Sequence, residues 1–344
     1  MRLFKEALSY DDVLVVPQYS DIQSRKEVSL GSSLGHYMMN LPIIGSPMDT
    51  IVETDMAVAL ANIGALGIIH RYNSIEEQVA IASTVAAKVK SNAVAAALPI
   101  SGDFVERAQA LMSAGVKIMC VDVAHGDHLM MRNALNSLKS KLPGHVHIMA
   151  GNVATQAGYE RLVEWGADSV RVGIGGGSIC STRVQTGHGV PTFQSILSCA
   201  ESKYAGVNPI IADGGIKTSG DIVKALGAGA DFVMIGSLFS GTTETPGKIM
   251  KREDGSKVKE YRGMASREAQ MAWRGRTSSL EGISTFVPFR GKVKYIVEDL
   301  SNGIRSGLSY TGARSIEEFQ ARVRFVQQTL AGQSESATHI LNRK

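Results

Sequence analysis

One pattern recurs along the chain and constrains its fold more than any other feature. A helix-like stretch ends at a pair of glycine and alanine, and a short apolar run follows at once. The pattern occurs in Asn62–His70 (NIGALGIIH), Ser113–Asp122 (SAGVKIMCVD), Trp165–Gly173 (WGADSVRVG) and Gly227–Gly236 (GAGADFVMIG). Glycine is typical of a left-handed helix C-terminus, and the runs are apolar on both faces, like strands buried in a parallel sheet. The pattern predicts an α/β protein.

Similar apolar runs raise the number of candidate strands to eight. They are Ile43–Ser46, Gly67–His70, Ala93–Leu98, Ile118–Val123, His147–Val153, Ser169–Gly173, Pro209–Asp213 and Phe232–Ile235. Helices are expected between them and after them, at Thr54–Ala61, Ser74–Val89, Phe104–Ala114 and Thr155–Glu164, from near Val293, and near Ile316–Leu330. Eight βα units predict a single (β/α)8 TIM barrel, and a doubly wound sheet is the alternative.

The chain has 344 residues, and the sequence predicts that residues 1–344 form one catalytic domain. Ser74–Val89 leads into the third strand without room for an insert. Residues 238–291 are polar, charged and long for a barrel loop, which predicts a flap or lid after the eighth strand. Residues 331–344 are predicted to be a flexible tail or a segment that contacts a neighbouring subunit.

Composition narrows the classes of function and location. Aromatic residues make up 6%, and the net charge of +4 is dispersed, so the sequence predicts no nucleic-acid partner. It contains no run of about 18 apolar residues, which predicts no membrane span. The three cysteines, Cys120, Cys180 and Cys199, have no disulfide-like or metal-like spacing. That spacing favours a reducing compartment, and we expect a cytoplasmic protein.

The loop Gly173–Arg183 (GIGGGSICSTR) carries the strongest functional signal. From Gly173 to Ser178 every residue except Ile174 is small, so backbone N–H groups can face a phosphate, or carbonyls a cation. A position after a barrel strand places Cys180 at the mouth, where nearby dipoles or Arg183 would favour its thiolate. The alternative is a plain flexible loop with a buried cysteine.

Two further loops follow the seventh and eighth strands, where barrels usually bind phosphate. They are Ile211–Ile216 (IADGGI) and Met234–Ser237 (MIGS). Asp213 is well placed to accept hydrogen bonds from ribose hydroxyls. The alternative is a pair of tight turns with a capping aspartate.

Taken together with other segments, these loops show that the chain resembles the family of IMP dehydrogenase and GMP reductase over nearly its whole length. Further matching segments are YDDV at 10–13, GSPMDT at 45–50, GIIHR at 67–71, VDVAHG at 121–126, GNV at 151–153, YRGM at 261–264 and YTGA at 310–313. The resemblance implies a barrel that binds a purine 5′-monophosphate (GMP or IMP) and a nicotinamide cofactor. It also implies a homotetramer.

The resemblance carries roles to individual residues. Cys180 matches the nucleophile that attacks purine C2, and Thr182 and Glu281 match the pair that protonates departing ammonia. Substrate-binding positions match Ser46, Met48, Ser178, Asp213, Gly215, Gly236, Ser237, Tyr261, Gly263 and Met264. Cofactor-binding positions match Asp122, Ala124 and Asn152. A monovalent cation such as K+ is implied at Gly175, Gly177 and Cys180, and Gly176 stands where the family usually has proline.

Members of this family catalyse two opposed reactions. The dehydrogenase oxidises IMP with NAD and then hydrolyses the thioimidate to XMP, whereas the reductase displaces ammonia from GMP and uses NADPH to give IMP. Both need the covalent cysteine. Dehydrogenases resemble one another in a flap Arg-Tyr pair that activates water, and Gly263–Glu281 (GMASREAQMAWRGRTSSLE) has no such dipeptide. The sequence therefore favours an NADPH-dependent GMP reductase that acts in purine nucleotide interconversion.

Three alternatives stay open at this point. Phe325–His339 (FVQQTLAGQSESATH) resembles the dehydrogenase tail, so an IMP dehydrogenase without CBS regulatory modules is one of them. A non-catalytic purine-nucleotide-binding barrel is the second, and Cys180, Thr182 and Glu281 argue against it. A flavin-dependent barrel shares the phosphate loops, but the cysteine loop and the flap disfavour it.

Overall fold

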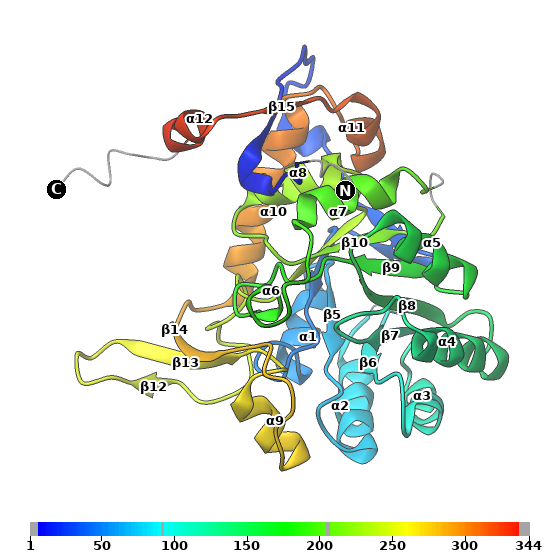
Figure 1. Cartoon of the computed structure of the whole chain (residues 1–344). Coiled ribbons are helices and arrows are strands. Elements are labelled where there is room, and N and C mark those ends of the chain that lie inside the picture. Colours follow the sequence, from blue (N-terminus) through cyan, green and yellow to red (C-terminus); the bar gives the residue numbers. More distant parts are fainter. Residues whose placement is uncertain (1–5, 91–92, 204–206, 337–344) are drawn as a thin grey trace.

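The centre of the computed structural model, which describes residues 6–90, 93–203 and 207–336, is a closed barrel of eight parallel strands (Figure 1). Each strand pairs with the next barrel strand along the chain, and the eighth closes on the first. This arrangement confirms the predicted single (β/α)8 TIM barrel. The strands are β4 (Ile43–Gly45), β5 (Leu66–Ile69), β6 (Ala95–Leu98), β7 (Ile118–Asp122), β8 (His147–Val153), β9 (Ser169–Val172), β10 (Ile210–Asp213) and β11 (Phe232–Ile235).

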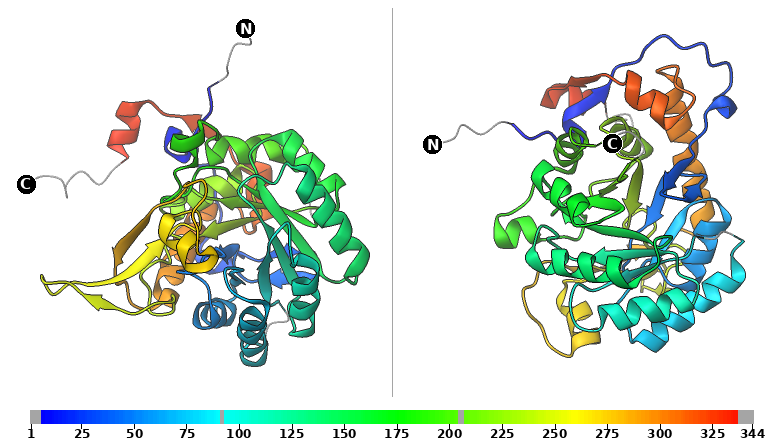
Figure 2. Two further views of the ribbon diagram at one scale, coloured as in Figure 1. Left: turned by 60° about the horizontal axis from the view of Figure 1, so that its bottom comes forward. Right: turned by 90° about the vertical axis from the view of Figure 1, so that its right-hand side faces the viewer.

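Helices follow the strands and cover the outside of the barrel (Figure 2). Because α2 ends at Lys88 and β6 begins at Ala95, no inserted domain separates these two elements. In the part of the chain that the structure describes, no helix has the length and apolar character needed to cross a membrane. The helices are α1 (Thr54–Asn62), α2 (Ile75–Lys88), α3 (Phe104–Ser113), α4 (Leu129–Lys141), α5 (Gln156–Glu164), α6 (Thr182–Thr186), α7 (Thr192–Ala200), α8 (Ser219–Gly227) and α10 (Val293–Ser309).

The glycines of the recurring pattern adopt the left-handed backbone that was predicted. The φ angles are 83° at Gly64, 95° at Gly115, 100° at Gly166 and 110° at Gly229. A residue with a Cβ atom is strained in this region. Glycine therefore lets each helix end turn directly into the next buried strand.

A hairpin of β2 (Ser32–Leu34) and β3 (Tyr37–Met39) packs against the barrel interior. Leu34 and Met39 are buried in one cluster with Ile44, Leu66 and Phe232, which lie on barrel strands. Leu66 and Phe232 begin their strands, so the hairpin covers the amino-terminal end of the barrel. A ligand must then enter at the carboxyl end, as in other barrels of this class.

The sequence misjudged the region after the barrel. A helix was expected near Ile316–Leu330, but α11 (Ile316–Arg322) is followed by the strand β15 (Phe325–Gln327) and the short helix α12 (Leu330–Glu335). β15 pairs antiparallel with β1 (Val13–Val15), which follows the 3-10 turn η1 (Tyr10–Asp12). This distant pairing overrides the local helical preference. Residues 337–344 of the predicted tail lie outside the described residues.

The segment 238–291 contains more regular structure than its polar composition suggests. It holds the antiparallel strands β12 (Met250–Lys251), β13 (Lys257–Arg262) and β14 (Ser284–Pro288), together with the helix α9 (Arg267–Arg274). Figure 1 shows the β12–β13 hairpin extending away from the barrel. The remaining element, the 3-10 turn η2 (Arg25–Glu27), precedes β2.

Candidate active site

A cavity of about 460 Å³ opens at the carboxyl end of the barrel, among the loops that follow its strands and the segment 263–281. A second cavity of about 180 Å³ adjoins it and shares Ser46, Met48, Cys180 and Asp213 with it. Volumes of this order are typical of small-molecule sites. Every residue that the resemblance matches to a catalytic, substrate, cofactor or cation position lines one of the two cavities, with the exception of Gly263.

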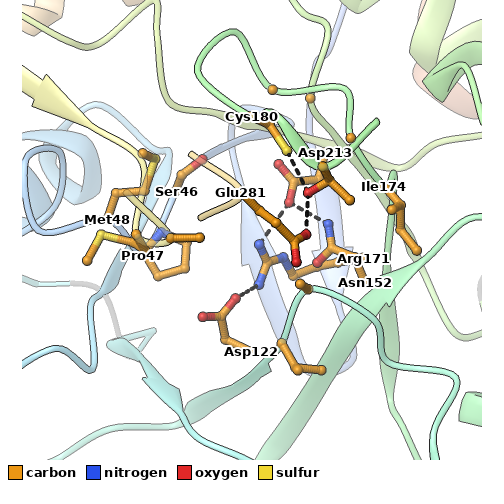
Figure 3. Close-up of a pocket in the computed structure, with 18 of the residues that line it drawn as sticks. Ser46, Pro47, Met48, Asp122, Asn152, Arg171, Ile174, Cys180, Asp213 and Glu281 are labelled. Atoms are coloured by element: carbon orange, nitrogen blue, oxygen red, sulfur yellow. Dashed lines mark hydrogen bonds and ion pairs between the residues drawn. The ribbon is translucent and has the colours of Figure 1, made fainter. Parts of the chain in front are cut away.

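Cys180 heads a chain of hydrogen bonds at the cavity mouth (Figure 3). Its thiol lies 3.2 Å from Thr182 Oγ1, and that hydroxyl donates to Glu281 Oε2 over 2.8 Å. Ser279 Oγ donates to the other oxygen, Oε1, over 3.1 Å. The three predicted catalytic residues therefore form one connected thiol–hydroxyl–carboxylate series.

Backbone pairing brings Glu281 to the cysteine loop, although Thr182 and Glu281 lie 99 positions apart in the sequence. The Ser181 N–H donates to the Glu281 carbonyl over 2.9 Å, and the Ile283 N–H donates to Ile179 O over 3.1 Å. Gly263 donates its N–H to Ile283 O over 2.9 Å. Gly263 thus anchors this backbone ladder instead of lining a cavity.

The small residues of the two glycine loops allow their backbones to touch. A Cβ atom at Gly173 would lie 2.0 Å from Asp213 O, and one at Gly214 would lie 2.9 Å from Gly176 C. At Gly176, where the family usually has proline, a Cβ atom would lie 2.4 Å from Thr192 Oγ1. Glycine at position 176 therefore fits the buried threonine beside it.

Two further predictions about this loop concern Arg183 and the proposed cation. The Arg183 guanidinium donates to Val190 O over 2.7 Å and to Ile174 O over 3.4 Å. It therefore holds the loop backbone, and its expected influence on Cys180 stays a prediction. Gly177 O, one of the expected cation contacts, accepts the Cys180 N–H over 3.1 Å.

The predicted phosphate contacts meet in the smaller cavity. Ser178, Gly215, Gly236, Ser237 and Tyr261 all line it. Ser178 Oγ and Tyr261 OH lie 3.4 Å apart. Burial raises the pKa of the Tyr261 hydroxyl, so it stays protonated and can donate a hydrogen bond to an anion.

A buried ionic network, which the sequence did not predict, lies beneath the larger cavity (Figure 3). Arg171 on β9 donates from one terminal nitrogen to Asp122 over 2.6 Å and from the other to Asp213 over 2.8 Å. Arg71 Nε donates to Asp122 over 3.2 Å, and Asn152 Nδ2 donates to Asp213 over 2.8 Å. The signal in the sequence was an arginine inside a buried strand, since a charge placed there needs partners.

The two arginines determine the ionisation of Asp122. Burial alone opposes its charge, but Arg171 and Arg71 outweigh burial and hold the pKa of this carboxyl below its usual value. Both of its oxygens accept hydrogen bonds from arginine. Asp122 therefore stays ionised at neutral pH.

The side of the cavity expected to receive a nicotinamide cofactor carries an open polar atom and two aromatic rings. Asn152 Oδ1 is buried without a hydrogen-bond partner among the described residues. The rings of Tyr72 and Trp273 meet edge to face at 5.4 Å, and the Arg274 guanidinium lies 4.4 Å from the centre of the Trp273 ring. An amide acceptor, aromatic surface and a cation suit a dinucleotide. Sequence reasoning missed the contact of Tyr72 with Trp273, because it joins two distant segments.

Comparisons with known proteins agree with this geometry. A family model described as "IMP dehydrogenase / GMP reductase domain" matches residues 7–339. GMP reductase of Serratia proteamaculans is 36% identical, with 93% of this chain and 94% of that protein covered. Inosine-5′-monophosphate dehydrogenase of Cryptosporidium parvum is also 36% identical, with 97% and 95% covered. Relatives of both activities are therefore similar to this chain.

A solved structure matches the whole architecture. It is a cysteine-to-alanine variant of GMP reductase from Trypanosoma brucei in complex with guanosine 5′-monophosphate. It is 32% identical, covers 98% of each chain and has a TM-score of 0.93. The family model, the relatives and this fold lead to one conclusion: the chain belongs to the IMP dehydrogenase / GMP reductase family.

Proposed function

We propose that the protein is an NADPH-dependent GMP reductase, which converts GMP to IMP and ammonia in purine nucleotide interconversion. The connected series of Cys180, Thr182 and Glu281 carries this proposal, because it offers a nucleophile and a path for protons. The segment 263–281 has no Arg-Tyr pair to activate water. The match to a GMP reductase solved with GMP supports the choice of substrate.

In the proposed reaction, Cys180 Sγ bonds to C2 of GMP while its proton passes through the Thr182 hydroxyl to Glu281. The C2–N bond then breaks, and the departing ammonia takes a proton back along the same path. Bound NADPH would supply a hydride to C2 of the resulting thioimidate. The C2–S bond then breaks to release IMP, and a proton from solvent regenerates the thiol. GMP, NADPH and two protons give IMP, NADP+ and ammonium.

The lining residues are proposed to bind the nucleotide in parts. The phosphate lies at Ser178, Gly215, Gly236, Ser237 and Tyr261, and the ribose at Asp213. Ser46, Met48 and Met264 line the base pocket, and Gly263 supports it. Met264 Sδ lies 3.4 Å from the Asp49 N–H, which orients it. Asp122, Ala124 and Asn152 form the cofactor side.

The proposal also covers the flap, the oligomeric state, the bound cation and the location of the enzyme. Residues 238–291 act as a flap over the site. The family resemblance supports a homotetramer and a K+ ion at Gly175, Gly177 and Cys180. The unpaired cysteine spacing supports a cytoplasmic location.

A paired assay tests the direction of the reaction. With GMP and NADPH the purified protein should oxidise NADPH and release ammonia in equal amounts. Cys180→Ala should abolish this turnover and still bind GMP, because the thiol acts in covalent chemistry. Cys199→Ala is the control, since that thiol is buried away from the cavity.

IMP dehydrogenase is the second candidate, because relatives of that name are as similar as the reductases. NADH formation from IMP and NAD, without turnover of GMP, would overturn the reductase proposal. The product would then be XMP, and a different group would have to activate the water.

A further inference from the structure

We propose that Arg171 is a positioning residue that makes the site selective for a ribonucleotide, by fixing the Asp213 carboxylate toward the ribose. The inference rests on the proposed function in that it takes a purine ribonucleotide as the ligand. Arg171 lies outside the glycine loops and the flap, and the family resemblance gave it no role. Its role follows from the contacts beneath the cavity.

The barrel is built to accommodate the Arg171 side chain. Arg171 is 6% exposed and stands on β9, a strand whose other three residues are fully buried or nearly so. On β8, a Cβ atom at Gly151 would lie 2.5 Å from Arg171 Cβ, so glycine leaves the space that the arginine occupies. Burial opposes its charge, but nearby acidic groups including Asp213 and Asp122 keep the pKa of the guanidinium well above its ordinary value.

The guanidinium fork bridges the two sides of the site. One terminal nitrogen binds Asp122, which belongs to the proposed cofactor side, and the other binds Asp213, the proposed ribose ligand. A planar fork with several donors can hold two carboxylates at once, which a lysine ammonium cannot do with the same geometry. Asp122 is in turn held by Arg71, so it orients Arg171.

This arrangement divides the work between the two oxygens of Asp213. Oδ2 accepts hydrogen bonds from Arg171 and from Asn152 Nδ2, each over 2.8 Å. Oδ1 has no hydrogen-bond partner among the described residues, and Asp213 lines both cavities. Two donors on one oxygen fix the carboxylate rotamer and leave the other oxygen to accept from ribose hydroxyls.

Loss of the fork should therefore reduce the preference for ribose, beyond any general loss of affinity. The probe is the affinity ratio between GMP and 2′,3′-dideoxy-GMP, which lacks both hydroxyls, measured by calorimetry without cofactor. Hydrogen bonds to a charged group predict a ratio of about ten or more for the unaltered protein. In Arg171→Gln the ratio should fall toward one, mainly because GMP binds more weakly.

Four further variants make the result specific. Asp213→Asn should lower the ratio as far as Arg171→Gln does, and the double variant should lower it no further, since both act through one carboxylate. Arg171→Lys should keep an intermediate ratio, and it decides the question if Arg171→Gln does not fold. Arg161→Gln is the control, because Arg161 makes an exposed ion pair with Asp127 outside the cavities and should keep the unaltered ratio.

An unaltered ratio in the Arg171 variants would overturn the proposal. If both affinities are also unaltered, Arg171 has no link to the ribose, and if both fall equally, its role is purely structural. The measurement needs no turnover, so a protein that binds GMP but fails to oxidise NADPH refutes the reductase and leaves the ratio to decide on Arg171. If GMP does not bind, the affinity ratio between IMP and 2′,3′-dideoxy-IMP serves as the same test.

Discussion

At the scale of single residues, Thr182 is the centre of the proposed chemistry. Its hydroxyl contacts a thiol on one side and a carboxylate on the other, so it can pass a proton in either direction. Attack by sulfur needs a proton acceptor, whereas departure of ammonia needs a donor. One hydrogen-bonded path serves both needs because Glu281 can hold the proton between the two events.

Glu281→Gln should test this path directly. The amide keeps the size of the side chain but cannot take up the proton, so we expect kcat to fall by about 10²–10⁴-fold with GMP and NADPH. KM for GMP should change little, because binding groups are intact. Glu268→Gln makes the same chemical change at an exposed position on α9 and should leave kcat within about two-fold. Equal kcat values in both variants would contradict the role of Glu281.

Nearly all residues with a predicted role in binding or catalysis line the site, and physical reasons explain the lining residues that the sequence missed. Cys180 and Asp213 follow barrel strands, so their position at the mouth is a consequence of topology. Arg171 lies inside a strand, and a sequence does not show which carboxylates a buried charge will meet. Tyr72 and Trp273 meet only after the segment 263–281 has folded over the barrel.

At the scale of elements, the glycine turns between helix and strand repeat around the barrel. Gly166 joins α5 to β9, and a Cβ atom there would lie 3.1 Å from Lys139 Cγ in addition to straining the backbone. Gly166→Ala should lower the free energy of unfolding by about 1–2 kcal/mol, measured by urea denaturation. Gly144→Ala is the matched control, because open space surrounds Gly144 and its φ is not positive. A similar loss in both variants would refute the argument from backbone strain.

The helix α9 is held over the cofactor side by one aromatic contact. Trp273 meets Tyr72 edge to face, and such a pair contributes about 0.5–1.5 kcal/mol. Trp273→Ala should therefore raise KM for NADPH by about 2–10-fold, with a smaller effect on KM for GMP. Met271→Ala is the control, since Met271 is an exposed apolar residue of the same helix. An equal rise in KM for NADPH in both variants would show that the ring contact is unimportant.

Local pattern predicted the barrel elements better than the elements around them. The eight strands are short apolar runs, and each is stabilised by the strands that precede and follow it in the barrel. β15 instead depends on β1, a partner from the far end of the sequence, and on the ring of Phe193, which lies 5.1 Å from that of Phe325. The helical periodicity near Ile316–Leu330 contains no information about β1 or Phe193, so it could not predict the strand.

At the scale of the whole molecule, His147, which lies against the hairpin of β2 and β3, makes the free energy of unfolding depend on pH. This residue begins β8 below the hairpin, and burial lowers the pKa of its imidazole to about 4. Its Nε2 lies 2.8 Å from Ser169 Oγ, and a Cβ atom at Gly35 of the hairpin turn would lie 3.1 Å from its Nδ1. The folded protein therefore holds His147 neutral.

The sign of the effect follows from the two pKa values. The unfolded imidazole titrates near 6.5, so below that pH the unfolded chain binds a proton that the folded chain does not. The free energy of unfolding should fall by up to about 3 kcal/mol between pH 6.5 and 4, and then level off. His147→Gln should lack this part of the pH dependence in urea denaturation, whereas His188→Gln, at an exposed position, should retain it. Parallel pH profiles for the unaltered protein and His147→Gln would refute the assignment.

The pairing of β1 with β15 has a consequence for how the active site comes into being during synthesis. Gln328 donates to the Asp11 carbonyl across 317 positions and so holds η1, where Tyr10 packs beside Gly215 of the smaller cavity. A nascent chain can complete all eight barrel strands while this wall of the nucleotide pocket still lacks its support. We expect a ribosome-bound chain to bind nucleotide with full affinity only once residues 325–328 have left the exit tunnel.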